Sequence, residues 1–403
     1  MRTPLYLDHA ATTPLDPRVA ALVIELMHEV YGNAGSRTHV WGTEARQYVD
    51  RARAQIADVV AAEPREVVFT SGATEANNLA ILGLADFGLA QGRRHIVSTA
   101  IEHKAVLEPL SEMERRGFEV TLVPPGPGGR VSTGDVMRAL RPDTLLVSIM
   151  HVNNETGIIQ PVRELSEALQ DHPAYLHTDA AQGYGKDLLT LKNKRIDFIS
   201  VSGHKIYGPK GVGALIARYR RFERPPLRPL MYGGGQEFGL RPGTLPSPQL
   251  AGFGLAAELS ASEVSERSSA CIGLGSRLAS LLESYDFKLV GDQTCRMPHI
   301  LAAAHPELDS EALMLLMRDC FSFSNGAACS SAEYAISHVY AALNLEREMT
   351  ERVVRLSWGH MTTIDDELIA AVVSAFRRAG LDRRTAESAV QTEVRSGGNA
   401  SHT

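Results

Sequence analysis

Apolar segments that read as buried strands alternate with helical segments along the first 220 residues, and this alternation restricts the fold more than any other feature of the chain. The strands are apolar along their length and do not alternate with a two-residue period, which is typical of strands covered on both faces. We therefore expect an α/β fold in which helices flank a mostly parallel sheet. The predicted strands of this sheet are residues 66–70, 95–99, 119–123, 144–150, 175–178, 196–201 and 212–217.

The chain turns irregular between residues 220 and 248, where prolines and the glycine run 233–235 interrupt any regular pattern. We place a domain boundary directly after this stretch. Residues 1–250 are predicted to form a large domain, although the first residues are free to pack with the second unit. Residues 251–385 are predicted to form a smaller α+β domain that carries a loop at 321–331. The polar residues 386–403 are predicted to be a disordered tail.

Composition excludes several classes of protein. The formal net charge is -6, so there is no electrostatic reason to expect direct binding of nucleic acid. The four cysteines lack paired CxxC spacing, which argues against a metal site and a disulfide framework and favours a reducing cytoplasm. Structure is predicted to begin at the strand 5–7, without room for a signal peptide, and the apolar stretches are too short to span a membrane.

Polar residues follow several of the predicted strands at their carboxyl ends, where ligands of open α/β sheets bind. Ala73 and Thr74 open a helix after a glycine turn, so free amides and a hydroxyl could hold a phosphate there. His103 suits stacking on a planar ring, and Asn154 suits donation to a phenolic oxygen. Simpler explanations stay open for each, namely helix capping by Thr74, solvation of a loop by His103 and turn formation by the asparagine.

Lys205 and Asp179 make the hypothesis more specific. Lys205 follows a buried strand on a turn that contains Gly208, Pro209 and Gly211, and its amine suits a Schiff base to an aldehyde cofactor. Asp179 ends another buried strand, where a carboxylate needs a positive partner such as a protonated pyridine nitrogen or an arginine. Taken alone, Lys205 is more simply a solvated surface lysine. Together with the phosphate cup and the amide, these residues supply the four parts that pyridoxal phosphate requires.

The same segments, in the same order, resemble the cysteine desulfurases, which are pyridoxal-phosphate enzymes of the aminotransferase class V group with fold type I. The resemblance spans nearly the whole chain and includes the loop SNGAACSS around Cys329. Gln236, Phe238 and His360 depart from it, standing where the family often has histidine, arginine and arginine. The motifs that carry the resemblance lie at residues 6–14, 32–36, 70–78, 152–155, 177–182, 200–211, 241–246 and 324–331.

The resemblance implies a role for each matching residue. Lys205 would carry the cofactor, His103 would stack on its ring, and Asp179 would pair with its pyridine nitrogen. Arg355, whose planar fork suits a carboxylate, would bind the substrate together with Asn33. Thr244 would reach the cofactor phosphate of a neighbouring subunit, which implies a homodimer. The remaining cofactor-binding residues implied by the resemblance are Ala73, Thr74, Asn154, Gln182, Ser202 and His204.

Cys329 distinguishes a desulfurase from other enzymes of fold type I, because the fold alone supports many reactions. Small residues on both sides of Cys329 predict an accessible, mobile segment, as a sulfur-carrying nucleophile requires. The implied reaction converts L-cysteine to L-alanine and leaves the sulfur as a persulfide on Cys329. Lys205 would abstract the α-proton, and His103 would assist proton transfer. Cys271, Cys295 and Cys320 read better as structural thiols.

Other functions stay open at this point. The closest rival is a class V lyase or aminotransferase acting on another amino acid, with Cys329 incidental. A catalytically silent scaffold for an iron–sulfur assembly partner would be expected to have lost Lys205, Asp179 or Cys329, and all three are present. The expected partners are L-cysteine, a second copy of the chain and a sulfur-acceptor protein. The acceptor could serve iron–sulfur cluster assembly, tRNA thiolation or DNA phosphorothioation.

Overall fold

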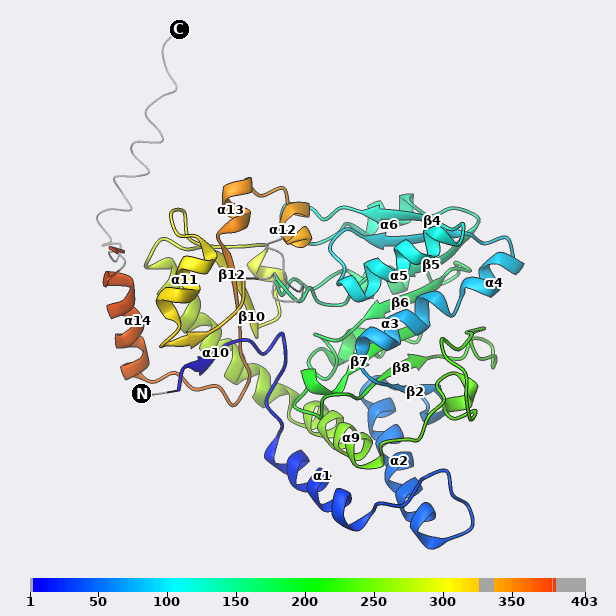
Figure 1. Ribbon diagram of the computed structural model, residues 1–403. Helices are drawn as coiled ribbons and strands as arrows, with labels where there is room; N and C mark the ends of the chain where they lie inside the picture. The colour runs from blue at the N-terminus through cyan, green and yellow to red at the C-terminus, as the bar shows by residue number, and fades with distance from the viewer. Residues whose placement is uncertain (1–2, 326–336, 379, 382–403) are drawn as a thin grey trace.

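The computed structural model describes residues 3–325, 337–378 and 380–381, and in this part of the chain a seven-stranded sheet forms the larger body (Figure 1). Its strand order is β2-β8-β7-β6-β5-β3-β4, and all pairs are parallel except those that β8 makes with β2 and β7. The predicted, mostly parallel sheet is confirmed. The strands are β2 (Val67–Thr70), β3 (His95–Thr99), β4 (Glu119–Val123), β5 (Thr144–Ser148), β6 (Tyr175–Asp179), β7 (Phe198–Ser202) and β8 (Gly213–Ala217).

Helices cover both faces of this sheet, which explains why its strands are apolar throughout. Neighbouring residues of one strand enter different cores: Val97 belongs to the core that includes residues of α1, α2 and α9, whereas Ile96 belongs to the core that includes residues of α3 and α5. The first group is α1 (Pro17–Glu29), α2 (Val40–Val59) and α9 (Ser247–Ser262). The remaining helices of this part are α3 (Ala73–Leu82), α4 (Ala85–Ala90), α5 (Lys104–Arg115), α6 (Thr133–Arg138), α7 (Val162–Ala168) and α8 (Leu188–Leu191).

A second body with its own core follows α9 in the chain and lies beside the large sheet in Figure 1. Its sheet, β12-β10-β9, is antiparallel. Strand β1 (Leu5–Tyr6) pairs with β11 (Phe321–Ser322), so the first residues pack against this second body. Its other strands are β9 (Lys288–Leu289), β10 (Ile300–Ala304) and β12 (Val353–Ser357), and its helices are α10 (Val264–Glu283), α11 (Ser310–Met317), α12 (His338–Ala342), α13 (Arg347–Glu351) and α14 (Asp366–Arg378).

Some boundaries differ from the sequence-based expectations. Helix α10 begins at Val264, eight residues before the predicted start at Ile272, because the polar stretch 264–271 continues the helix directly after α9. The predicted strand 144–150 ends at Ser148, and the strand predicted at 175–178 extends to Asp179. The predicted tail and most of the loop 321–331 lie outside the described residues. No helix among the described residues has the length and apolar character needed to cross a membrane.

Candidate active site

A pocket of about 510 Å³ lies at the carboxyl ends of the parallel strands. Its walls come from the segments after β2, β3, β5, β6 and β7, which meet at one edge because the strands that precede them point the same way. The pocket brings together ten residues predicted from the sequence. They are Ala73, Thr74, His103, Asn154, Asp179, Gln182, Ser202, His204, Lys205 and Arg355.

Lys205 ends a short 3₁₀ turn, η2 (Gly203–Lys205), that directly follows strand β7. Its Nζ donates to the carbonyl oxygens of Ala10 and Ala11, the latter at 2.7 Å. Thr13 holds the same turn from both sides, since its Oγ1 donates to the His204 carbonyl at 3.0 Å and accepts from the Tyr207 amide at 2.9 Å. The segment 10–16 therefore holds the turn that carries Lys205 in position.

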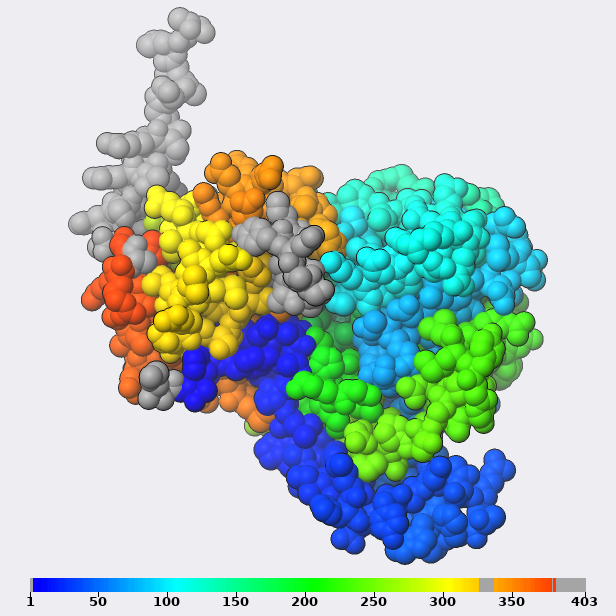
Figure 2. Space-filling model, viewed as in Figure 1, coloured from blue at the N-terminus to red at the C-terminus, as the bar shows by residue number. Residues whose placement is uncertain are grey.

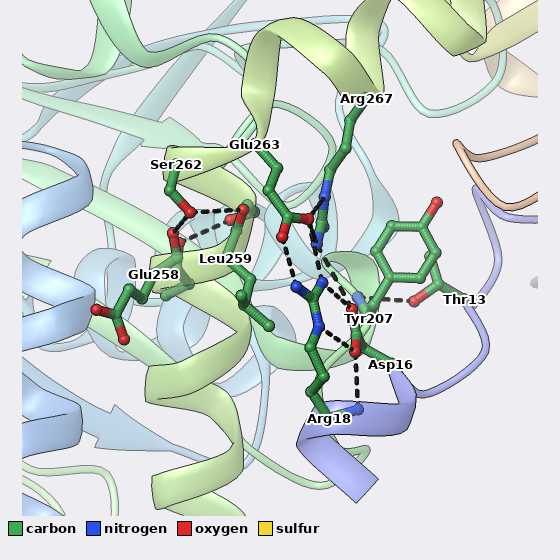
Figure 3. A network of polar contacts seen from close by, with 11 residues as sticks. Thr13, Asp16, Arg18, Tyr207, Glu258, Leu259, Ser262, Glu263 and Arg267 are labelled. Atoms are coloured by element: carbon green, nitrogen blue, oxygen red, sulfur yellow. Dashed lines mark hydrogen bonds and ion pairs between the residues drawn. The ribbon is translucent and has the colours of Figure 1, made fainter.

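The segment 10–16 ends at a cluster of charged side chains, which Figure 3 shows beside Thr13 and Tyr207. Arg18 bridges Asp16 at 2.8 Å and Glu263 at 2.6 Å, and Arg267 pairs with Glu263 at 2.8 Å. A hydrogen bond from Arg18 lowers the pKa of Asp16. Hydrogen bonds from Arg18 and Arg267 lower the pKa of Glu263 to about 2. Because Asp16 also donates its amide to the Tyr207 carbonyl at 3.0 Å, the cluster ties the lysine turn to the junction of α9 and α10.

Asp179 lies at the end of β6 with its carboxylate buried in the pocket wall. One carboxylate oxygen accepts from the Ala181 amide at 2.9 Å, and the other accepts from Asn77 Nδ2 at 2.7 Å. These donors are neutral, and no described cation forms an ion pair with Asp179. A buried carboxylate held in this way suits a positively charged ligand atom, such as a protonated ring nitrogen.

His103 caps helix α5 by accepting the Ala105 amide on its Nδ1 at 3.0 Å. Burial lowers its pKa, and the positive charge of Lys205 acts in the same direction while Asp179 opposes it. The preceding residue, Glu102, is fully buried and accepts from Thr99 Oγ1 and the Met150 amide, both at 2.8 Å. Burial raises the pKa of Glu102 to about 8, so it is a neutral support beneath the pocket at pH 7.

The other end of the pocket is built to receive an anion. Helix α3 begins there at Ala73, and its first amides and dipole favour negative charge. Ser202 and His204 face it from the end of β7. Burial lowers the pKa of His204 to about 4, helped by the charge of Lys205, so this ring is neutral at pH 7. Gly213 lets β8 approach closely, because a Cβ atom there would lie 2.6 Å from Gly72 Cα.

Two side-chain amide oxygens in the pocket wall have no hydrogen-bond partner among the described residues. Asn154 Oδ1 and Gln182 Oε1 are buried without a hydrogen bond to any described residue, although Gln182 Nε2 donates to the Ala10 carbonyl at 2.8 Å. Buried unpaired amides are costly and indicate a ligand. The donor set as a whole, a lysine, a carboxylate, amides and a helix N-terminus, fits pyridoxal phosphate.

Arg355 reaches the pocket from strand β12 of the second body. It is 2% exposed and donates to Asp8 Oδ1 at 2.7 Å and to the Asn154 carbonyl at 3.0 Å, while its Nε has no described partner. Three predicted site residues are not in this pocket. Asn33 and Thr244 line a different surface pocket, and Cys329 lies outside the described residues.

Sequence reasoning missed several pocket residues. Asn77 follows Thr74 by three positions, so the helical period alone could have placed it on the same face of α3. Lys210 and Thr12 also line the pocket, and His204 Nδ1 lies 3.1 Å from Thr12 Oγ1. Nothing local in the sequence marks Ala10 and Ala11, because they contribute only backbone carbonyls.

Comparisons with known proteins define the class. The aminotransferase class-V profile matches residues 5–367. The cysteine desulfurase IscS of Azotobacter vinelandii is 42% identical over 377 residues, covering 92% of each chain. Among solved structures, DndA of Streptomyces lividans is 50% identical with a TM-score of 0.78, covering 88% of this chain and 99% of its own. A NifS-like protein is 33% identical with a TM-score of 0.85, covering 94% of this chain and 100% of its own.

The chain therefore belongs to the aminotransferase class-V family, with fold type I and dependence on pyridoxal phosphate. This confirms the fold, cofactor and family predicted from the motifs. Its relatives place it more narrowly, among the cysteine desulfurases.

Proposed function

We propose that the pocket binds pyridoxal phosphate on Lys205 and that sulfur from L-cysteine is collected on Cys329. The observation that carries this proposal is the convergence of Lys205, Asp179 and the N-terminus of α3 around one cavity. Bound there, pyridoxal phosphate would supply an electron sink for negative charge at the substrate α-carbon. Asp179, fixed by Asn77, would stabilise the ring nitrogen, and the α3 amides with Ser202 and His204 would hold the phosphate.

The side chains around the substrate would bind it and move protons. Arg355 is held by Asp8 and Asn154 and would grip the substrate carboxylate. Lys205 Nζ would remove the proton from the substrate α-carbon and later return one to the product. Burial lowers the pKa of His103, and because its Nδ1 accepts the Ala105 amide, the neutral ring carries its proton on Nε2, from which it would assist proton transfer by donating to the reacting groups.

The described residues on either side of the Cys329 segment are attached at the pocket. Before it, the amide of Arg355 donates to the Ser324 carbonyl at 2.6 Å. After it, Ser337 Oγ donates to Glu155 Oε2 at 2.5 Å, one residue from Asn154. Arg355 lines the pocket and Glu155 directly follows the lining residue Asn154, which supports delivery of Cys329 to the substrate.

The sulfur transfer balances without an external oxidant. The Cys329 thiolate attacks the substrate sulfur, the S–S bond forms and the substrate Cβ–S bond breaks. The electron pair of that bond stays on the three-carbon fragment, which is protonated and leaves as L-alanine. Cys329 is left as a persulfide, from which an acceptor protein takes the terminal sulfur. We propose that this transfer takes place in the cytoplasm. The acceptor would be a protein of iron–sulfur cluster assembly, tRNA thiolation or DNA phosphorothioation.

We further propose that the enzyme is a homodimer in which Thr244 and Asn33 contribute to the site of the partner. They line one surface pocket beside Tyr31, which is 71% exposed and stacks on Trp41 with ring centroids 5.2 Å apart. The blue part of the chain that contains α1 and the start of α2 protrudes at the bottom of Figure 2, and exposed apolar side chains of this kind suit an interface. They are Ile24, Met27, Tyr31, Val40 and Trp41.

The test measures alanine and sulfide released from L-cysteine with a reductant. We expect the parent protein and a Cys295→Ala control to form both products, and Cys329→Ala to retain the cofactor absorbance but form neither. Equal activity of Cys329→Ala would instead favour a class V lyase in which Cys329 is incidental. Absence of activity in the parent would refute the reaction itself.

A further inference from the structure

A second cavity lies behind the lysine turn, between the large sheet and the second body. It is lined by Ile206 and Tyr207, directly after Lys205, and by residues of α10 and of the segment 297–299 from the second body. It shares no lining residue with the cofactor pocket. Its volume is about 50 Å³, which is enough for roughly three or four water-sized groups. A ligand of about four non-hydrogen atoms would fill it.

The charged side chains that line this cavity are all basic among the described residues. Among the described residues that line it are basic groups and a thiol, but no carboxylate. Arg267 is neutralised by Glu263 at 2.8 Å, so the unbalanced charge is that of Lys186. The basic groups and the thiol are His9, Lys186, Arg267, Cys271, His299 and His360.

Lys186 is the residue that indicates a bound ligand. Its Nζ donates to His299 Nε2 at 3.1 Å, and the described residues give it no carboxylate partner. His299 cannot share the charge, because burial and the nearby Lys186 hold its pKa well below the usual range. His9 Nδ1, in the same wall, is buried without a hydrogen bond to any described residue. A partly buried ammonium without a counter-ion is unfavourable, and a bound anion would relieve this.

We propose that this cavity is a binding site for a small monocarboxylate, such as formate or acetate, held by the Lys186 ammonium. The carboxylate would supply the missing negative charge. The apolar walls formed by Ile206, Met297 and Trp358 suit a short alkyl group better than a fully hydrated inorganic ion. The cavity volume of about 50 Å³ favours a carboxylate with a short chain.

Occupation of this site acts on the active site through charge. Lys186 and Lys205 repel each other, and Ile206 connects the cavity wall to the catalytic lysine along the chain. A bound carboxylate would screen Lys205 from the Lys186 charge. The existence of the site does not depend on the proposed reaction.

Binding should strengthen as the pH falls. Burial lowers the pKa of Lys186 to about 7, the charge of Lys205 acts in the same direction, and Cys271 opposes them. His9, His299 and His360 are held neutral near pH 7, and Arg267 stays charged and paired, so none of them reverses this dependence. Since only the ammonium form binds the anion, the affinity should rise roughly 20-fold between pH 8.5 and pH 6.5.

The experiment is calorimetric titration of the cofactor-loaded enzyme with sodium acetate and sodium formate, using sodium chloride as the ionic-strength control. Lys186→Met and Lys186→Gln remove the charge, and Lys192→Met removes the same charge from an exposed position. We expect one site per chain in the parent and in Lys192→Met, and at least tenfold weaker binding in both Lys186 variants. In the parent and in Lys192→Met, acetate should raise the melting temperature more than chloride does.

Other results would overturn the proposal. They include equal binding in the Lys186 variants, equal effects of acetate and chloride, and affinity that does not change between pH 6.5 and pH 8.5. Cys271→Met provides a further check, because it fills the cavity while Lys186 is retained, and it should also abolish binding. These readouts do not use desulfurase activity, so they separate failure of this site from failure of the proposed function.

Discussion

Replacement of Asn77 by alanine tests whether the carboxylate of Asp179 depends on a neighbour that the sequence does not single out. Asn77 is 0% exposed, and its Nδ2 donates to Asp179 Oδ2 at 2.7 Å. In Asn77→Ala, Asp179 keeps the Ala181 amide and loses its second donor. A hydrogen bond to a charged group is worth about 2 kcal/mol, which corresponds to a roughly 30-fold effect.

We expect that loss in the binding of pyridoxal phosphate and in kcat/KM for L-cysteine. The assays are cofactor release followed by absorbance during dialysis, a pH titration of the cofactor spectrum, and initial rates. Asn78→Ala is the matched control, since Asn78 Nδ2 donates to the Thr74 carbonyl and does not line the cofactor pocket. An unchanged spectrum and unchanged cofactor retention in Asn77→Ala would refute the reasoning.

Three further predictions concern other buried charges. Glu102, with a pKa raised to about 8 by burial, is protonated in the folded state and ionised in the unfolded state from about pH 4.5 to 8, so stability should fall as the pH rises through that window. In Glu102→Gln the melting temperature should fall less between pH 5 and pH 8, and a parallel fall in both proteins would contradict this. Arg355→Lys loses the planar fork, so KM for L-cysteine should rise at least tenfold with a smaller change in kcat; an unchanged KM in steady-state assays would argue against its contact with the carboxylate. Glu237→Ala breaks a buried ion pair with Arg53 at 2.5 Å and should lower the free energy of unfolding, measured with denaturant, by about 3–5 kcal/mol. Glu63→Ala breaks an exposed pair and should lower it by about 0–1 kcal/mol. Similar decreases in the two variants would refute the role of burial.

Local patterns were sufficient for much of the site. The apolar run before Lys205 and the glycines after it predicted a lysine on a turn at the end of a strand, and the structure has that turn directly after β7. The same reasoning placed Asp179 at the end of a buried strand. Because parallel strands share one carboxyl edge, the convergence of these two residues with Thr74 and His103 followed from the fold class.

Contacts between distant segments could not be predicted in this way. The hydrogen bond between Asn77 and Asp179 joins residues 102 positions apart, and the backbone carbonyls that hold Lys205 belong to residues 194 and 195 positions before it. Arg355 arrives from the sheet of the second body. The antiparallel direction of β8 is also a tertiary result, because an apolar run has the same pattern in either direction.

The sequence by itself determined the alternation of strands and helices, the chemistry available at the strand ends and the membership in a family of pyridoxal-phosphate enzymes. These properties depend on periodicity, on turn residues and on residue types, all of which are local. Only the tertiary structure decided which neutral donors fix Asp179, how the segment 10–16 holds the lysine turn, and that Lys186 lies beside a second cavity with no carboxylate partner among the described residues. Those features depend on packing between segments far apart in the chain, where burial sets the cost of each charge and each unpaired polar group.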